Sequence, residues 1–304
     1  MGMETEEQSP DRFVASFATQ GYVLSREAAT ALFLAESLGR PLLVEGPAGV
    51  GKTELARTLA GVGTRPFFRL QCYEGLDESR ALYEWEYGKQ LLYTQVLRDR
   101  VGEVIGEAPD LETAVRRLGE HASAFFSREF LLPRPVLQAL LADERAVLLI
   151  DEIDRADEEF EAFLLEVLAD FAVTIPEIGR VEARCRPTVV LTSNGTRNLS
   201  DALRRRCLFL YVDFPSREME RKILARRVPD LDAALAERVV RYVERVRALD
   251  LRKTPGISET IDWAATLVLL HARSLGPELL KSSLCALLKE RTDQERVLRD
   301  VPPT

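Results

Sequence analysis

The sequence predicts an α/β fold, in which helices cover both faces of a parallel sheet in three layers, followed by a small all-helical domain. Three observations support this prediction. Short apolar runs typical of buried strands alternate with amphipathic helical segments as far as residue 214. A glycine-rich phosphate-binding motif lies between the first of these strands and the helix that follows it. From residue 216 onward, only helical periodicity is present.

The N-terminal part of the chain is expected to be disordered at first and then helical. Residues 1–12 are polar and acidic, without the basic and apolar pattern of a signal peptide. Ser25 is a good N-cap for a helix that continues to Leu38, and Gly39 is suited to end it.

The rest of the chain divides into an α/β domain at 13–214, a helical lid domain at 215–292 and a tail at 293–304. Five strands are expected, at residues 42–45, 67–71, 146–150, 188–192 and 208–212. A hairpin is expected around Pro176 and Gly179. An insertion at about 72–145 is expected to contain helices at 91–105 and 111–126. Further helices are expected at residues 54–60, 158–169, 217–228, 232–249, 258–273 and 277–290.

Composition excludes some classes of protein. The 304 residues are 46% hydrophobic and 30% charged, which is typical of a globular protein. The net charge of −8 argues against a general nucleic-acid coat, although residues 180–227 contain twelve Lys and Arg against five Asp and Glu. No apolar run is long enough to span a bilayer, and the four cysteines lack metal-site spacing. We therefore expect free thiols, no membrane span and a cytoplasmic location.

The phosphate-binding motif is G-x-x-x-x-G-K-T, preceded by a predicted strand and followed by a predicted helix. Glycines allow the backbone to turn its N–H groups toward phosphate oxygens, and the helix dipole adds to the attraction. The lysine is placed to reach the β- and γ-phosphates, and the threonine hydroxyl to bind Mg²⁺. The predicted nucleotide-binding residues are Gly46, Pro47, Ala48, Gly49, Val50, Gly51, Lys52 and Thr53.

A second half of the site is predicted where the 146–150 strand ends in Asp151 and Glu152. In an open α/β sheet, ligands bind at the carboxyl edge of the strands. Asp151 is therefore suited to hold Mg²⁺, and Glu152 to orient or deprotonate the attacking water. The alternative is an acidic turn, but the phosphate loop upstream favours the catalytic interpretation.

Two more groups of candidate site residues follow along the chain. Asn194 ends the next strand and could hydrogen-bond the γ-phosphate or the water, or it could simply form a turn before Gly195. The run at 204–206 is three arginines. Such a run is commonly a solvated face, but at the edge of a nucleotide-binding sheet it could point toward the triphosphate of a neighbouring subunit.

Together these residues resemble an AAA+ ATPase, and the finer pattern is similar to the MoxR family and its CoxD-like branch. The stretches that carry the resemblance are residues 43–53, 149–156, 170–176 and 258–264. The resemblance implies an AAA+ P-loop NTPase domain with a five-stranded sheet and a helical lid. It further implies that Lys52 and Thr53 match Walker A, Asp151 and Glu152 match Walker B, and Asn194 matches sensor 1. Arg206 is the best match to the arginine finger, with Arg205 as the second choice.

The resemblance also implies partners and a role. Members assemble as rings, usually hexamers, with ATP and Mg²⁺ between subunits. They act as chaperones that mature or remodel metalloenzymes and other complexes, commonly with a partner that contains a von Willebrand factor A domain. CoxD-like members are similar to factors that help to build the molybdenum–copper site of carbon monoxide dehydrogenase, so a molybdenum enzyme is one candidate client.

The sequence departs from the AAA+ pattern at one position, and two other functions are alternatives to the chaperone interpretation. Many AAA+ lids contain a sensor 2 arginine, but residues 256–260 contain none, and Arg252 and Lys253 precede that stretch. An AAA+ nucleic-acid motor is the first alternative, supported by the basic 180–227 segment and opposed by the acidic net charge. A scaffold that binds ATP and barely hydrolyses it is the second, opposed by the presence of Glu152.

Overall fold

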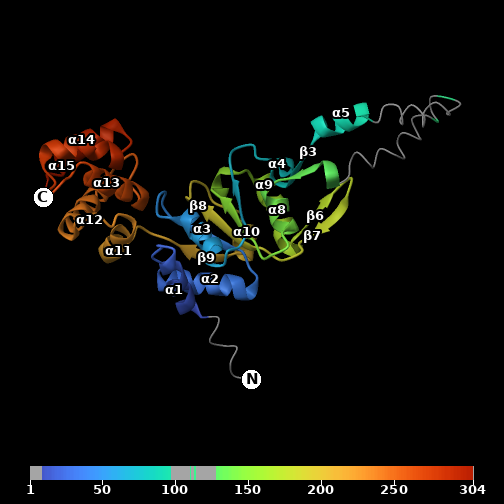
Figure 1. Ribbon diagram of the computed structural model, residues 1–304, viewed down its shortest axis with the longest axis horizontal. Helices are drawn as coiled ribbons and strands as arrows, with labels where there is room; N and C mark the ends of the chain where they lie inside the picture. Colours follow the sequence, from blue (N-terminus) through green and yellow to red (C-terminus); the bar gives the residue numbers. More distant parts are fainter. Residues whose placement is uncertain (1–8, 97–109, 111–112, 114–127, 304) are drawn as a thin grey trace, which may run out of the picture.

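The computed structural model describes residues 9–96, 110, 113 and 128–303 (Figure 1). Residues 1–8 of the expected disordered segment 1–12, residues 97–105 of the helix expected at 91–105, and the helix expected at 111–126 therefore lie outside the described residues, apart from single positions. Within the described part of the chain, no helix is both long and apolar enough to cross a bilayer.

A five-stranded parallel sheet forms the centre of the α/β part, in the order β2-β5-β8-β1-β9. The parallel sheet predicted from the sequence is confirmed, and all five strands lie within one or two residues of their expected positions. The strands are β1 Leu42–Glu45, β2 Phe67–Gln71, β5 Val147–Asp151, β8 Thr188–Ser193 and β9 Leu208–Tyr211.

Helices cover both faces of this sheet, because side chains of successive strand residues point to opposite faces and both sets are apolar. On one face, Leu42, Val44 and Leu149 pack against the N-terminal helices. On the other face, Leu43, Ile150 and Leu191 pack against a second set of helices. The first set is α1 Pro10–Thr19, α2 Arg26–Leu38 and α3 Lys52–Val62, and the second is α4 Glu78–Leu82, α8 Pro135–Leu141, α9 Glu158–Asp170 and α10 Asp201–Arg206.

The N-terminal prediction is partly corrected. Helix α1 begins at Pro10, so the expected disorder does not extend to residue 12. The helix is held because Phe17 is fully buried against α2 and α3. The predicted cap of α2 is confirmed: the Ser25 hydroxyl accepts a hydrogen bond from the Ala28 N–H at 3.1 Å, and Gly39 ends the helix with a φ of 61°.

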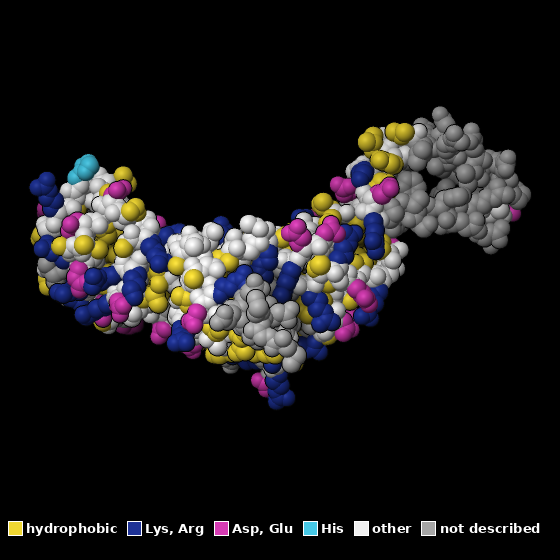
Figure 2. All heavy atoms as spheres, turned by 60° about the horizontal axis from the view of Figure 1, so that its bottom comes forward, with side chains coloured by type: hydrophobic (Ala, Val, Ile, Leu, Met, Phe, Trp, Pro, Cys, Tyr) yellow, Lys and Arg dark blue, Asp and Glu magenta, His cyan; other side chains and the backbone are white. Residues whose placement is uncertain are grey.

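The insertion begins and ends in ordered structure, of which the sequence predicted only a helix starting at residue 91. Strands β3 Tyr83–Trp85 and β4 Leu131–Pro133 form an antiparallel pair that lies next to α8. Helix α5, Tyr87–Val96, follows β3, and the short η1 helix, Arg128–Phe130, precedes β4. Figure 2 shows yellow hydrophobic side chains gathered at this end of the molecule. The second antiparallel pair, β6 Ala172–Ile175 and β7 Gly179–Glu182, is the hairpin predicted around Pro176.

The C-terminal region is entirely helical among its described residues. Its core contains Trp263 and Tyr242, both fully buried, and the Trp263 Nε1–H donates to the Ser283 hydroxyl at 2.9 Å. The helices are α11 Arg217–Arg227, α12 Ala233–Arg247, α13 Ile257–Leu269, α14 Pro277–Leu287 and α15 Arg291–Asp300. We call this set of helices the lid.

The structure differs from the tail expected at residues 293–304. Most of that stretch forms α15, whose Val297 is fully buried in the lid core, while Val301 just after the helix is 3% exposed. Asp293 fastens the start of the helix, because its carboxylate accepts hydrogen bonds from the N–H groups of Arg252 and Lys253. The lid therefore extends to about residue 301, beyond the predicted end at 292.

This correction predicts a stability effect in α15. Val297→Ala should lower the free energy of unfolding of the lid by about 1–3 kcal/mol, because it removes two buried methyl groups. Leu298→Ala on the same helix is the control, since that side chain is 41% exposed and should cost less than about 0.5 kcal/mol. Urea unfolding followed by Trp263 fluorescence, in a Trp85→Phe background, measures both. Equal small effects would mean that α15 does not pack on the lid.

Candidate functional site

The phosphate loop joins the end of β1 to the start of α3, as the motif predicts. At Gly46 the backbone has a φ of 156°, and a Cβ atom there would lie 1.9 Å from the Val212 carbonyl oxygen. Gly49 and Gly51 also have positive φ angles, 77° and 96°. Residues with side chains rarely adopt these conformations, so the glycine spacing is a requirement of this backbone path.

Lys52 is buried at the centre of the site. Its Nζ donates to the Gly46 carbonyl at 2.6 Å, the Pro47 carbonyl at 2.7 Å and Asn194 Oδ1 at 2.8 Å. Burial lowers the pKa of Lys52, and the carboxylates of Asp154 and Asp151 offset only part of this effect. All three hydrogen-bond partners are neutral, so the ammonium group is available to an anionic ligand such as a phosphate.

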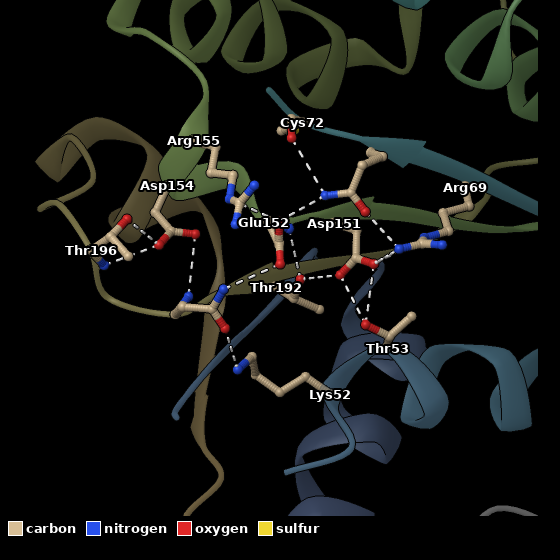
Figure 3. Close-up of polar contacts among 12 residues, drawn as sticks. Lys52, Thr53, Arg69, Cys72, Asp151, Glu152, Asp154, Arg155, Thr192 and Thr196 are labelled. Atoms are coloured by element: carbon tan, nitrogen blue, oxygen red, sulfur yellow. Dashed lines mark hydrogen bonds and ion pairs between the residues drawn. The ribbon is translucent and has the colours of Figure 1, made fainter. Parts of the chain in front are cut away.

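Asp151 and Thr53 lie together as the sequence predicts (Figure 3). The Thr53 hydroxyl lies 3.1 Å from each carboxylate oxygen of Asp151. The Asp151 carboxylate is almost fully buried, and it also accepts from the Thr192 hydroxyl. Mg²⁺ prefers hard oxygen ligands of this kind, so Thr53 and Asp151 are chemically suited to hold the ion.

Glu152 follows Asp151 in a left-handed backbone conformation with a φ of 56°. Such a conformation is uncommon for a residue with a side chain, and it ends the extended backbone of β5 at Asp151. The Glu152 Oε2 accepts from Gln71 Nε2 at 3.0 Å and from Arg155 Nε at 2.9 Å. Gln71 and Arg155, which the sequence analysis did not single out, therefore fix the position of the predicted base.

Asn194 links the two halves of the site. Its Oδ1 accepts from Lys52, and its Nδ2 lies 3.4 Å from Glu152 Oε1. Asp154 positions it, because this carboxylate accepts from the Asn194 N–H and from both the N–H and hydroxyl of Thr196. Burial raises the pKa of Asp154, but these hydrogen bonds outweigh it and the net pKa is lowered. Asp154 stays ionised and holds the strand end.

The three arginines do not all point the same way. The Arg204 guanidinium donates to Glu45 Oε2 at 2.9 Å, which ties it to the end of β1 in its own chain. Arg205 and Arg206 are exposed. Arg206 Nη1 donates to the Leu165 carbonyl at 3.0 Å, and within the described part of the chain neither side chain bonds to the cluster around Lys52. The two candidates for the finger thus face outward.

A cavity of about 550 Å³ lies beside the phosphate loop. The N-terminal segment, the connection from β9 to the lid, and α13 all contribute to its walls. The Tyr22 hydroxyl donates to the Gly51 carbonyl at 3.4 Å, and burial raises the pKa of Tyr22. Sequence reasoning missed this cavity because it is formed by segments about 200 residues apart, which no local motif reveals.

The lid contacts the phosphate loop directly. The N–H of Ile257, the first residue of α13, donates to the Gly49 carbonyl at 2.9 Å. A Cβ on Gly256 would lie 2.6 Å from the Gly49 backbone, so only glycine permits this approach. The side chains of Arg252 and Lys253 are exposed, and their N–H groups are bonded to Asp293. The contact that joins the lid to the loop is therefore made by backbone, in the stretch without a sensor 2 arginine.

This close approach predicts that Gly256→Ala separates the lid from the loop. The affinity for a fluorescent ATP analogue should fall by about tenfold or more, corresponding to about 1.4 kcal/mol, because the cavity between lid and loop widens. Gly276→Ala is the matched control, since Gly276 is also an N-cap and an added Cβ there meets nothing within 4 Å. Similar affinities for both variants, by equilibrium titration, would contradict the role given to this contact.

Comparisons with known proteins agree with this geometry. Residues 41–207 match the family described as AAA domain (dynein-related subfamily). The chain is 28% identical over 221 residues to the gas vesicle ATPase GvpN of Haloferax mediterranei, covering 69% of this chain and 57% of GvpN. It is 26% identical over 264 residues to protein NorQ of Paracoccus denitrificans, covering 85% of this chain and 83% of NorQ. The chain thus spans little more than half the length of GvpN.

A solved structure, the Thermotoga maritima RuvB Holliday junction branch migration motor, is similar with a TM-score of 0.44 and 19% identity, over 94% of this chain and 74% of that one. A likeness at this level supports no conclusion about function.

The CoxD-like branch remains a prediction, because the comparisons do not specify it. The family match covers more than half of the chain, which confirms the AAA+ prediction. The chain belongs to the AAA domain family, dynein-related subfamily, and it is an AAA+ ATPase of the MoxR type.

Proposed function

We propose that this chain hydrolyses Mg²⁺-ATP at the cluster around Lys52 and uses the energy to remodel a protein client. The observation that supports this most strongly is the position of Asn194. Its amide contacts both Lys52, which is suited to bind phosphate, and Glu152, which is suited to activate water. One side chain can therefore respond to the γ-phosphate and to the base together.

Each residue has a role in this proposal. The loop Gly46–Thr53 and Lys52 bind the phosphates, and Thr53 and Asp151 hold Mg²⁺. When bound, the ion supplies charge neutralisation at the phosphate oxygens. Glu152 accepts the proton of the attacking water, and Gln71 and Arg155 keep its carboxylate in place. The apolar walls of the cavity beside the loop suit the nucleoside part of ATP.

The exposed arginines are proposed to act on a neighbouring subunit in a homo-oligomeric ring, with a hexamer as the expected form. Arg206 is the proposed finger and Arg205 the second choice, since both are exposed on the short helix before β9. Arg40 holds this helix end, donating to the Arg205 carbonyl at 2.7 Å and the Arg206 carbonyl at 3.2 Å. An arginine supplied in trans is worth roughly 10³–10⁵ in rate.

The client is proposed to be a metalloenzyme that needs maturation, such as a molybdenum hydroxylase of the carbon monoxide dehydrogenase kind, or another protein complex. A protein with a von Willebrand factor A domain is the proposed partner. The resemblance to CoxD-like sequences supports the metalloenzyme client, and the similarity to NorQ and GvpN supports an ATPase of MoxR type.

The cytoplasmic location expected from the cysteines also remains a prediction. In the structure all four thiols are free, with Cys72 and Cys207 buried and Cys285 exposed.

The alternative is a nucleic-acid motor, for which the basic 180–227 segment is the supporting observation. Several of its arginines are paired with carboxylates, such as Arg184 with Asp143 and Arg180 with Glu182. On the face drawn in Figure 2, Lys and Arg side chains lie among Asp and Glu side chains. Single-stranded DNA binding that weakens steeply with salt would support the motor, and no binding at low salt would exclude it.

The role of Glu152 predicts the behaviour of Glu152→Gln. This variant should bind ATP and lose at least about 100-fold in turnover, because the amide cannot accept the proton of the water. Glu159→Gln, an exposed glutamate on α9, is the control and should hydrolyse ATP normally. Phosphate release and filter binding of labelled ATP measure the two properties. Near-normal hydrolysis by Glu152→Gln would show that another group is the base.

The trans finger predicts a mixing result. Arg206→Ala should retain ATP binding and lose hydrolysis, because the transition-state charge is no longer neutralised. Mixed with Lys52→Ala subunits, which still present an arginine but do not bind ATP, it should regain part of the activity. Arg205→Ala tested in parallel decides between the two arginines. No rescue in rings that still form, seen by light scattering, would contradict the assignment in trans.

A further inference from the structure

Asp151 has a cationic partner that the proposed catalytic set does not use. The guanidinium of Arg69, on β2, approaches Asp151 Oδ2 with Nε at 2.9 Å and Nη2 at 2.7 Å. Figure 3 shows Arg69 reaching this carboxylate from the opposite side to Lys52. Two short N–H···O⁻ contacts to one carboxylate oxygen make a strong charge-assisted pair. Arg69 is therefore bound to the group that is suited to hold Mg²⁺.

The strand register explains why Arg69 reaches Asp151. Strand β2 pairs in parallel with β5, and Gln71 lies opposite Asp151. Arg69 is two residues before Gln71, so its side chain lies on the same face of the sheet, next to α3 and Thr53. Gln71 Oε1 accepts from Arg69 Nη2 at 2.6 Å and keeps the guanidinium in this position. The contact thus follows from the backbone pairing of the edge strand β2 with its neighbour β5.

The Asp151 carboxylate that Arg69 contacts is the same carboxylate that would bind Mg²⁺. The Thr53 hydroxyl lies 3.1 Å from both oxygens of Asp151, so an ion held by Thr53 and Asp151 would sit beside the oxygen that Arg69 occupies. Mg²⁺ takes its oxygen ligands at about 2.0–2.1 Å in near-ideal octahedral geometry. A guanidinium on the same oxygen repels the ion and blocks one direction of approach.

Burial differs sharply between the two partners. The Asp151 side chain is 3% exposed, whereas the Arg69 side chain is 42% exposed. The carboxylate cannot leave, and without a cation its buried charge would be costly. The arginine has access to solvent, where its charge is well hydrated. When a second cation arrives, Arg69 is the partner that can move.

We propose that Arg69 is the resident counter-cation of Asp151 in the metal-free site, and that it leaves Asp151 Oδ2 when Mg²⁺-nucleotide binds. Arg69 then competes with the metal and sets how strongly ATP binding depends on Mg²⁺. It is a positioning residue, since it acts on the site through Asp151. This inference rests on the proposed role of Asp151 as a metal ligand, and the experiment separates the failure of one from the failure of the other.

The test compares the affinity of nucleotide-free protein for a fluorescent ATP analogue in Mg²⁺ and in EDTA. The measured quantity is the ratio of the dissociation constant in EDTA to that in Mg²⁺. Arg69→Ala should raise this ratio by about fivefold, the worth of roughly one partly exposed ion pair, because the metal no longer displaces a guanidinium. Arg69→Lys, which keeps the charge and loses the fork, should raise it by about twofold.

Arg134→Ala is the matched control. Arg134 pairs with Glu84 and is 39% exposed, close to the exposure of Arg69, but its partner lies on strand β3 of the insertion. Its ratio should equal that of the wild type. Thermal unfolding without ligand adds a second readout: Arg69→Ala should lower the midpoint relative to Arg134→Ala, because it leaves the buried Asp151 without its partner.

The outcomes are distinguishable. Asp151→Asn should abolish the gain in affinity from Mg²⁺. If it does so while Arg69→Ala leaves the ratio unchanged or lowers it, the inference about Arg69 is overturned and the metal role of Asp151 stands. If Asp151→Asn keeps the full gain from Mg²⁺, both the metal role and the inference are overturned. A raised ratio in Arg69→Ala and Arg69→Lys, with Arg134→Ala unchanged, supports the proposal.

Discussion

The parallel pairing of β5 between β2 and β8 is the constraint on which the site depends. It places the ends of three strands at one edge, so that Gln71, Asp151 and Thr192 lie side by side. The end of β1, next to β8, delivers the phosphate loop to the same edge. A slip of β5 by one residue against its neighbours would turn Asp151 from α3 toward the opposite face, because strand side chains alternate.

This arrangement concentrates carboxylates at a buried edge, and the surrounding hydrogen bonds compensate for their charge. Asp151 pairs with Arg69, Glu152 with Arg155, and Asp154 with the N–H and hydroxyl groups of the 194–196 turn. Lys52 bonds only to neutral oxygens. The site is therefore a set of paired acids around one available ammonium group, which favours an anionic ligand that arrives with its own cation.

The strands could be predicted from the sequence, and the candidate site residues could be named from it, because both have local signatures. Buried strands are short apolar runs, and the phosphate loop needs glycines at fixed positions such as Gly46 and Gly51. The contacts of Arg69, Gln71 and Gly256 could not be predicted, because they depend on packing between distant segments: β2 against β5, and the start of α13 against the phosphate loop. Helix α15 was missed for a related reason. It contains only two apolar residues, Val297 and Leu298, so its sequence has no clear helical pattern, and burial of Val297 depends on the other lid helices.

The central claim is that the strand ends, the loop and the lid form one Mg²⁺-nucleotide site in each chain. Isothermal titration calorimetry of nucleotide-free protein with ATP in Mg²⁺ tests it most directly, with Lys52→Ala measured beside the wild type. The account predicts one site per chain in the wild type and at least about a hundredfold weaker binding, a loss of about 2.8 kcal/mol, in the variant. Equal binding by both proteins, or no binding by the wild type, would contradict it.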